Sequence, residues 1–443
     1  MSGIYIHIPF CKQACSYCDF YFVTRDRLIP EFLDALHQEI DSVPVPDGSP
    51  FPSDPVRTVY IGGGTPSRLS EMQIQRLFEA LQRRFDLSEL TECTVEVNPE
   101  DASTDWLSNL KELGVTRLSM GIQSFQPDLL EFMHRAHTAD QAHRALEQVR
   151  DAGFPTFSVD LIYGCPDQDL NQLREDMRLL MYYRPPHVSA YSLTIEPRTR
   201  LGRQAALGRL KPADDEKILV QARVVRQALA RYGIHQYEIS NYAAPGDEAV
   251  HNTAYWRHEN YLGLGPAAHS FYWPRGGREG VRWYNPPDIH KYGRMVRSPH
   301  ITTRFVGSNE WKEAAQPAES QETTGTAGTT GTTGTTGTAG MGGSAETADS
   351  LSNRQDTTGS DSAIAEILSL KTLAGERLLT GLRTAYGIHP DELQTRYGHP
   401  LSSNQRQQID RFRHQGFLLP DNPLRLTENG MDLADALTLR LMD

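Results

Sequence analysis

Residues 11–18 of the chain read CKQACSYC, so that three cysteines stand in the spacing C-x3-C-x2-C directly after an apolar run at residues 4–8. Three thiolates can hold three irons of a 4Fe-4S cubane and leave the fourth iron open to another ligand. Zinc is the alternative, but a structural zinc site takes four ligands, and the sequence contains no second C-x2-C pair. We therefore predict a 4Fe-4S cluster on Cys11, Cys15 and Cys18.

The two remaining cysteines have different surroundings. Five cysteines in total, three of them within eight residues, make a poor disulfide framework, and clustered thiols in a reducing cytosol indicate metal ligands. Cys93 lies in the apolar run CTVEV and is predicted to be a small buried side chain. Cys165, in the turn YGCPDQ, is predicted to be a loop thiol without a partner at ligand spacing.

Short apolar runs alternate with amphipathic stretches from residue 4 to about residue 195. Several of the amphipathic stretches begin with Ser, Thr or Asp and two end with Gly, which is typical of helices. Repetition of strand and helix predicts an α/β fold with a parallel sheet and helices outside it. Six units predict a partial (β/α)6 barrel, with the chemistry at the carboxyl ends of its strands. The predicted strands are residues 4–8, 58–61, 94–97, 117–122, 156–163 and 188–193.

Changes in composition divide the chain into four predicted parts. Residues 1–235 are predicted to form the barrel, and residues 236–313 an extension rich in aromatic side chains. Residues 314–363 include TTGTAGTTGTTGTTGTAGMGG, which has almost nothing to bury and predicts a disordered insertion without a chemical role. Residues 364–443 predict a small winged-helix-like α+β domain, for which we favour a packing or lid role over DNA binding.

Charge and hydropathy limit the partners and the compartment. The net charge of −12 opposes a phosphate backbone as the main partner, so we expect no nucleic acid. The sequence has no run of about 18 apolar residues, and we expect no transmembrane segment. The N-terminus, MSGIYIHIPF, lacks a signal-peptide pattern, so we expect a cytoplasmic protein. The sequence is compatible with peripheral contact with a membrane and with a homodimer.

The cysteine spacing resembles that of the radical S-adenosylmethionine (SAM) superfamily, in which the open iron binds the amino and carboxylate groups of SAM. The resemblance therefore implies SAM as a second cofactor. Residues 62–66, GGGTP, follow the second predicted strand and are similar to the glycine-rich loop of the superfamily. In that loop, missing side chains let the backbone approach the methionine moiety of SAM. Glycines also serve any tight turn, and the position at a strand end is what favours the SAM interpretation.

More closely, the chain resembles the oxygen-independent coproporphyrinogen III oxidases and their HemW relatives, over nearly all of its length outside the predicted insertion. The resemblance implies SAM contacts in the segments VEVNPE, MGIQSF, MHRAH and VDLIYG. For Glu96 and Asp160, the alternative is a strand-end carboxylate satisfied by local hydrogen bonds. The implied SAM-binding residues are Tyr5, Gly63, Gly64, Thr65, Glu96, Gln123, Arg135 and Asp160.

Two departures from the oxidases favour the HemW relatives. The oxidases carry a fourth cysteine two residues after the third, where this chain has Phe20. They also have an N-terminal extension, whereas the first predicted strand here begins at Ile4.

A third feature is the segment HNTAYW at residues 251–256, which is similar to the HNxxYW motif associated with haem binding in HemW proteins. Imidazole is a common axial ligand of haem iron, and Tyr and Trp rings can pack against the macrocycle. The resemblance therefore implies haem contacts at His251, Tyr255 and Trp256. The alternative is that Tyr255 and Trp256 belong to the core and that His251 forms hydrogen bonds in a loop.

The function that the resemblance implies is a haem chaperone. Such a protein binds haem and transfers it to an acceptor protein, here unidentified, while the cluster and an exchangeable SAM tune the oligomeric state or the transfer. The alternative is a radical SAM enzyme of porphyrin biosynthesis, which cleaves SAM to a 5'-deoxyadenosyl radical and decarboxylates coproporphyrinogen III. Phe20 and the position of the first strand disfavour this oxidative decarboxylation, the coproporphyrinogen III dehydrogenase activity. A purely structural role is disfavoured because a cluster with an open iron is sensitive to oxygen.

Overall fold

The computed structural model describes residues 2–42, 51–274, 279–298, 303–306 and 363–442. The strands in this part of the chain are β1 (Ser2–Ile8), β2 (Thr58–Gly63), β3 (Glu92–Val97), β4 (Arg117–Gln123), β5 (Thr156–Tyr163), β6 (His187–Ser192), β7 (His235–Gln236), β8 (Asn241–Ala243), β9 (Asn260–Leu264), β10 (His269–Tyr272), β11 (Gly280–Tyr284), β12 (Thr303–Val306) and β13 (Ala363–Leu368). They join into a single sheet in the order β12-β13-β11-β10-β9-β1-β2-β3-β4-β5-β6-β8-β7.

The helices surround this sheet. The elements described are η1 (Asp26–Leu28), α1 (Ile29–Ser42), η2 (Pro66–Arg68), α2 (Glu71–Arg84), α3 (Thr104–Glu112), α4 (Pro127–Phe132), α5 (Ala139–Ala152), α6 (Leu170–Tyr183), α7 (Arg200–Ala206), α8 (Asp215–Ala230), α9 (Val250–Trp256), α10 (Ile289–Arg297), α13 (Leu370–Leu382), α14 (Pro390–Tyr397), α15 (Ser403–His414), α16 (Glu428–Met431) and α17 (Ala434–Met442). None of these helices is long and apolar enough to cross a lipid bilayer.

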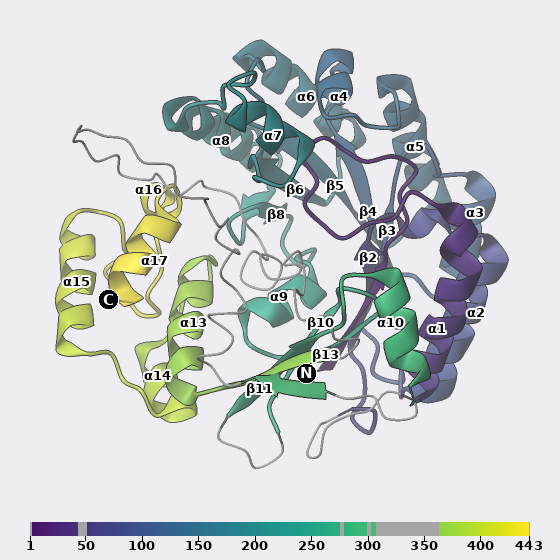
Figure 1. Cartoon of the computed structure of the whole chain (residues 1–443). Helices are drawn as coiled ribbons and strands as arrows, with labels where there is room; N and C mark the ends of the chain where they lie inside the picture. Colours follow the sequence, from purple (N-terminus) through teal and green to yellow (C-terminus); the bar gives the residue numbers. More distant parts are fainter. Residues whose placement is uncertain (1, 43–50, 275–278, 299–302, 307–362, 443) are drawn as a thin grey trace, which may run out of the picture.

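Strands β1 to β6 are the six predicted strands, and each neighbouring pair among them is parallel. Helices α1 to α8 lie in an arc around their outer face (Figure 1). Local sequence sets where these helices begin, since Ser70, Thr138 and Asp169 each form a capping box at a helix N-terminus. Such caps contribute about 1 kcal/mol each.

The parallel pairing of β1 to β6, with helices outside (Figure 1), confirms the predicted α/β partial barrel.

Both edges of the barrel sheet continue into further strands. At one edge, β8 and β7 follow β6 in antiparallel pairing. At the other edge, the added strands begin beside β1. β9 pairs in parallel with β1, and β10, β11 and β13 then follow in antiparallel pairing. This edge places β9, from the predicted extension, next to the first strand of the barrel, with β10 and β11 beyond it. The predicted insertion at residues 314–363 lies outside the described residues except for Ala363, the first residue of β13.

The C-terminal part packs its own apolar core between α13, α14, α15 and α17, and Tyr261 and Phe271 from the sheet belong to the same core. After α15, Leu418 and Leu426 form an antiparallel bridge, and helices α16 and α17 follow. Asp432 binds Arg226 of α8 over 2.5 Å and ties this part to the barrel. The predicted domain boundaries stay predictions.

The two cysteines outside the cluster motif are both buried. Cys93 lies in β3 within the barrel core, as its apolar surroundings predict. Cys165 follows β5 in a turn but is buried in a small apolar cluster with Leu129 and Ile162.

Candidate functional site

A cavity of about 610 Å³ lies inside the arc of the barrel. One side is formed by β1 to β6 and the loops that follow them, and the other by α9, β9 to β11 and α13. In Figure 1, α9 and β10 lie between the barrel helices and the C-terminal helices. The volume is within the range of about 300–1,000 Å³ that is typical of ligand sites. The cavity is lined by every residue predicted to bind the cluster, SAM or haem: Tyr5, Cys11, Cys15, Cys18, Gly63, Gly64, Thr65, Glu96, Gln123, Arg135, Asp160, His251, Tyr255 and Trp256.

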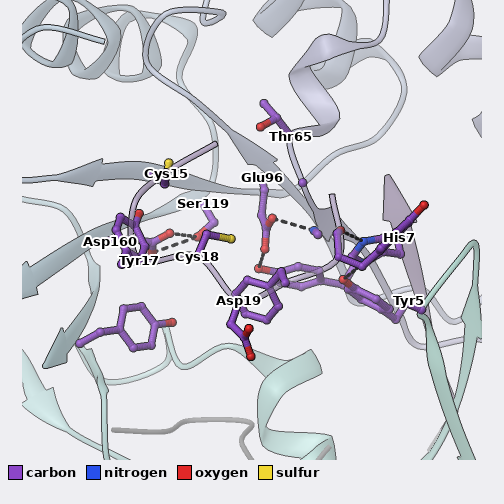
Figure 2. A pocket seen from close by; sticks show the side chains of 18 of the residues that line it. Tyr5, His7, Cys15, Tyr17, Cys18, Asp19, Thr65, Glu96, Ser119 and Asp160 are labelled. Atoms are coloured by element: carbon purple, nitrogen blue, oxygen red, sulfur yellow. Dashed lines mark hydrogen bonds between the residues drawn. The ribbon is translucent and has the colours of Figure 1, made fainter. Parts of the chain in front are cut away.

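The three cysteines lie on the loop after β1 and line this cavity. Figure 2 shows Cys15 and Cys18. Burial raises the pKa of the Cys11 thiol to about 11 and that of the Cys18 thiol to about 12. The protonated thiol is therefore the favoured form without a metal. Iron binding must release these protons, because the thiolate is the ligand form.

The spacing of the thiols bears on the choice between a single ion and a cluster. Among the described residues, no three His, Cys, Asp or Glu side chains converge closely enough to hold one metal ion. The three cysteines share a loop and a cavity without forming such a group. A cubane takes one thiolate on each of three irons, whereas a structural zinc site takes four ligands, so the cluster on these three cysteines stays a prediction.

A chain of hydrogen bonds links two of the cysteines across the barrel. Thr65 Oγ1 donates to Cys11 Sγ over 3.6 Å, and Asn98 Nδ2 donates to Thr65 Oγ1 over 3.0 Å. Arg135 Nη2 donates to Asn98 Oδ1 over 2.7 Å, and its Nη1 donates to Cys15 Sγ over 3.3 Å. Sequence reasoning missed Asn98. Its place immediately after β3, where barrel chemistry is expected, was the available signal.

Arg135 brings a positive charge to the cysteine loop. Burial acts to lower the pKa of its guanidinium, but neighbouring Tyr17 and Cys15 outweigh this and raise the pKa above its ordinary value. The guanidinium therefore stays charged. A half-buried cation beside Cys15 stabilises the thiolate and any other negative charge placed nearby.

The glycine-rich loop approaches β1 more closely than side chains would permit. Gly63 has φ +108°, and a Cβ there would lie 2.4 Å from His7 Nδ1. A Cβ on Gly64 would lie 2.7 Å from the carbonyl carbon of Pro9. Glu96 holds the loop in place, because the Gly63 N–H donates to its Oε2 over 3.0 Å (Figure 2).

Glu96 also accepts a hydrogen bond from the hydroxyl of Tyr60, over 2.7 Å. Asp160 likewise has a local partner, since Ser119 Oγ lies 3.1 Å and 3.2 Å from its two oxygens (Figure 2). Burial raises the pKa of Asp160 to about 6. Both carboxylates thus form the local hydrogen bonds that a purely structural strand-end carboxylate would form. Both also line the cavity. Tyr60 and Ser119 are lining residues that sequence reasoning missed.

Gln123 ends β4 in the left-handed conformation, with φ 64°. Its buried Oε1 has no hydrogen-bond partner among the described residues. The side chain therefore offers an unused acceptor at the cavity wall. Tyr5 lies on the same wall, with its hydroxyl 3.0 Å from His7 Nδ1.

The HNTAYW segment forms helix α9 instead of a loop. His251 is buried, its Nδ1 lies 2.8 Å from Thr58 Oγ1, and its Nε2 lies 2.7 Å from the hydroxyl of Tyr255. Burial lowers the pKa of His251 to about 3, so the ring is neutral. Ligation of iron by this imidazole, as predicted, requires the Tyr255 hydroxyl to leave Nε2.

Phe20 also lines the cavity, close to the cysteine loop, and its side chain is 49% exposed. The position at which the oxidases carry a fourth thiol therefore presents an apolar ring with no ligand atom.

Known proteins with similar sequences cover most of this chain. The radical SAM superfamily profile matches residues 5–180. The heme chaperone HemW of Bacillus subtilis is 40% identical over 316 residues, which cover 70% of this chain and 80% of that protein. The heme chaperone HemW of Escherichia coli is 36% identical over 269 residues, which cover 60% of this chain and 69% of that protein.

Among solved structures, the coproporphyrinogen III oxidase HemN of Escherichia coli, a radical SAM enzyme, matches with a TM-score of 0.72. The match covers 99% of this chain and 89% of that chain, at 19% sequence identity. At this identity the likeness shows the fold alone.

Proposed function

Because this chain belongs to the HemW family of radical SAM proteins, we propose that it binds haem and transfers it to an acceptor protein. One 4Fe-4S cluster and an exchangeable SAM occupy the same cavity in this proposal. The observation that carries it is that the cysteine loop and the HNTAYW helix line one continuous cavity. A ligand bound against α9 therefore shares this cavity with the cluster, and a change in the ligands of the cluster can alter the binding of that ligand.

In this proposal, Cys11, Cys15 and Cys18 hold three irons, and the fourth iron stays open for SAM. When bound, the cluster supplies an electron-transfer centre and a chelating iron. The chain contributes buried acceptors, since the oxygens of Glu96, Gln123 and Asp160 suit a ligand that carries an amino group and hydroxyls. Thr65 and Arg135 hold the cysteine loop by hydrogen bonds to sulfur.

Haem is the cargo in this proposal and lies against α9. Tyr255 and Trp256 offer aromatic surface to a flat macrocycle, and Tyr261 and Phe271 add to it from β9 and β10. His251 supports this surface through its bond to the Tyr255 hydroxyl. A wall built from aromatic rings suits a large planar ligand better than a small polar one.

The test is a haem-transfer experiment under anaerobic conditions. Protein with a reconstituted cluster is incubated with haemin, and the bound haem is counted by the pyridine haemochrome assay. We expect about one haem per chain, and faster delivery to a haem-free cytochrome than from haem-loaded serum albumin, which serves as a matched donor. Absence of stoichiometric binding, or delivery no faster than from albumin, contradicts the proposal.

The alternative function is oxidative decarboxylation of coproporphyrinogen III. The fold it requires is present, but Phe20 supplies no thiol at the position of the fourth cysteine. A turnover assay that separates the two functions is given among the predictions below.

A further inference from the structure

His269, the first residue of β10, carries a buried imidazole whose nitrogens are both unused. The residue is 6% exposed, and neither Nδ1 nor Nε2 has a hydrogen-bond partner among the described residues. Its ring stacks on Tyr284, with the centroids 5.1 Å apart and the planes at 24°. Burial, with a smaller effect of Arg282, lowers the pKa of His269 to about 3, so the ring is neutral. Buried polar groups nearly always have partners, and this exception points to a ligand.

The strand geometry places His269 on the cavity wall. Alternate residues of a strand face opposite sides, and in β10 His269 and Phe271 line the cavity. The residues between and after them face the other side of the sheet. Ser270 Oγ accepts from the Gly263 N–H over 2.8 Å, and Tyr272 packs in the barrel core.

The other histidines of the cavity wall differ from His269 in this respect. His7, His251 and His258 each have a ring nitrogen near a tyrosine hydroxyl, at 3.0, 2.7 and 3.3 Å respectively. The second ring nitrogen of His7 lies 2.9 Å from a backbone carbonyl, and that of His251 lies 2.8 Å from a threonine hydroxyl. The second nitrogen of His258 lies 3.9 Å from a glutamate carboxylate. Of the histidines described on this wall, His269 alone keeps both nitrogens unengaged.

The surroundings of His269 match the chemistry of an iron porphyrin. Tyr255, Tyr261 and Phe271 form a run of aromatic rings along the wall, with centroid distances of 4.5 Å and 6.3 Å between neighbours. Arg282 lies over the Phe271 ring and binds Glu376 through its terminal nitrogens. Its buried Nε has no partner among the described residues, so it offers a donor to a carboxylate such as a propionate.

We propose that His269 is an axial ligand of the haem iron in this protein. The inference rests on the proposed haem-binding function and places the iron ligand outside the HNTAYW segment. Neutral imidazole donates its lone pair to the iron without releasing a proton. Histidine ligands usually donate their other N–H to a protein acceptor, which raises their basicity. His269 lacks such an acceptor in the described structure, so it should be a weaker donor, which suits an iron that must be handed on.

The experiment titrates haemin into the anaerobic full-length protein and into three variants: His269→Ala, His251→Ala and His258→Ala. Haem-minus-apo difference spectra in the Soret region and EPR of the ferric haem report the ligand, while iron content and thermal unfolding report the fold. We expect His269→Ala to lose the histidine-ligated signals and to bind haem about tenfold more weakly or worse. Added free imidazole should restore the histidine-ligated signals, which a merely structural defect would not permit.

His258→Ala is the matched control, a histidine of the same wall whose Nδ1 lies 3.3 Å from the Tyr397 hydroxyl, and should keep the wild-type signals. If His269→Ala does not retain its cluster or its thermal transition, His269→Gln tests the same loss with a side chain of similar length. Wild-type signals in the folded His269 variant, loss of them only in His251→Ala, or wild-type haem without histidine ligation each overturn the inference. Wild-type protein that binds no haem instead overturns the proposed function, and the inference with it.

Discussion

Arg135 Nη1 donates to the sulfur of Cys15 over 3.3 Å, although the two residues are 120 positions apart in the sequence. Arg135 is half-buried, and its guanidinium is anchored to Asn98 by its other terminal nitrogen. Its charge is thus fixed beside one of the three predicted cluster ligands. A cation fixed in a half-buried position affects the electron affinity of a cluster more strongly than a freely solvated surface charge does.

Substitution of Arg135 by Gln should lower the reduction potential of the reconstituted cluster. Removal of one positive charge makes addition of an electron less favourable, and the expected shift is on the order of 50 mV. An EPR-monitored redox titration measures it. Arg135→Lys keeps the charge and should shift the potential less; an equal shift in both variants would point to geometry and not charge.

Any one of Cys11→Ala, Cys15→Ala and Cys18→Ala should abolish the cluster, because each thiolate holds a different iron. Wild-type protein should contain about four irons per chain after anaerobic reconstitution. Iron and sulfide analysis provides the measurement. Cys93→Ala and Cys165→Ala are the controls, and both should keep their iron because these thiols lie in apolar cores. Retention of iron in any of the first three, with loss in the Cys165 variant, would show that the ligand assignment is wrong.

Glu96→Ala should weaken SAM binding by loosening the glycine-rich loop. The substitution leaves the Gly63 N–H and the Tyr60 hydroxyl without their acceptor, which costs about 1–3 kcal/mol of folding stability. Isothermal titration with SAM and urea unfolding measure the two effects. Glu175→Ala, at an exposed ion pair on α6, is the matched control and should change neither. Unchanged SAM affinity in Glu96→Ala would remove this residue from the site.

Asp160 should make folding stability depend on pH. Its pKa is about 6 in the folded protein against an ordinary value of 3.8. Between these values the folded protein keeps a proton that the unfolded chain has released, so the contribution of this group to stability falls as pH rises from about 4 to about 6. Asp160→Asn cannot ionise. Its stability relative to wild type should therefore rise over that window, by about 1–3 kcal/mol. Urea unfolding at both ends of the window checks this, and a constant difference would contradict the raised pKa.

The reconstituted protein should not convert coproporphyrinogen III to protoporphyrinogen IX. With SAM, a low-potential reductant and no oxygen, we expect no product above background, because the Phe20 ring cannot replace a thiol in hydrogen bonding or redox chemistry. Product analysis by chromatography is the measurement, with the oxidase HemN of Escherichia coli as the positive control. Cleavage of SAM without decarboxylation is compatible with the chaperone function. Multiple turnovers to protoporphyrinogen would restore the oxidase assignment.

The barrel was predictable because its strands are encoded locally. Each predicted strand from β1 to β6 occurs within about two residues of its expected bounds, since apolar runs and helix caps act over short distances. The same rule about strand ends could have identified Asn98 as well as Gln123. Cys165 shows the limit of local reasoning, because a turn sequence does not reveal that its side chain packs under Leu129 and Ile162.

The far wall of the cavity could not be read from the sequence. Which side of β10 faces inward depends on its pairing with β9 and β11, and these pairs form between segments with no periodic signal of their own. His269 was therefore not a candidate before the structure placed it. Likewise, the partners of His251 come from β2 and from its own helix, and only tertiary packing brings Thr58 to its ring.

Tyr60 joins the two halves of the cavity through a single side chain. Its hydroxyl binds Glu96 on the glycine-loop side, and its ring stacks on His251 of α9, with the centroids 5.3 Å apart. A ligand that draws Glu96 away removes the acceptor of the Tyr60 hydroxyl, and a ligand that displaces His251 removes the ring on which Tyr60 stacks. Thermodynamic reciprocity then requires that, if SAM alters the affinity for haem by some factor, haem alters the affinity for SAM by the same factor. A measurement of the affinity for one ligand would thus report whether the other ligand is bound to the protein.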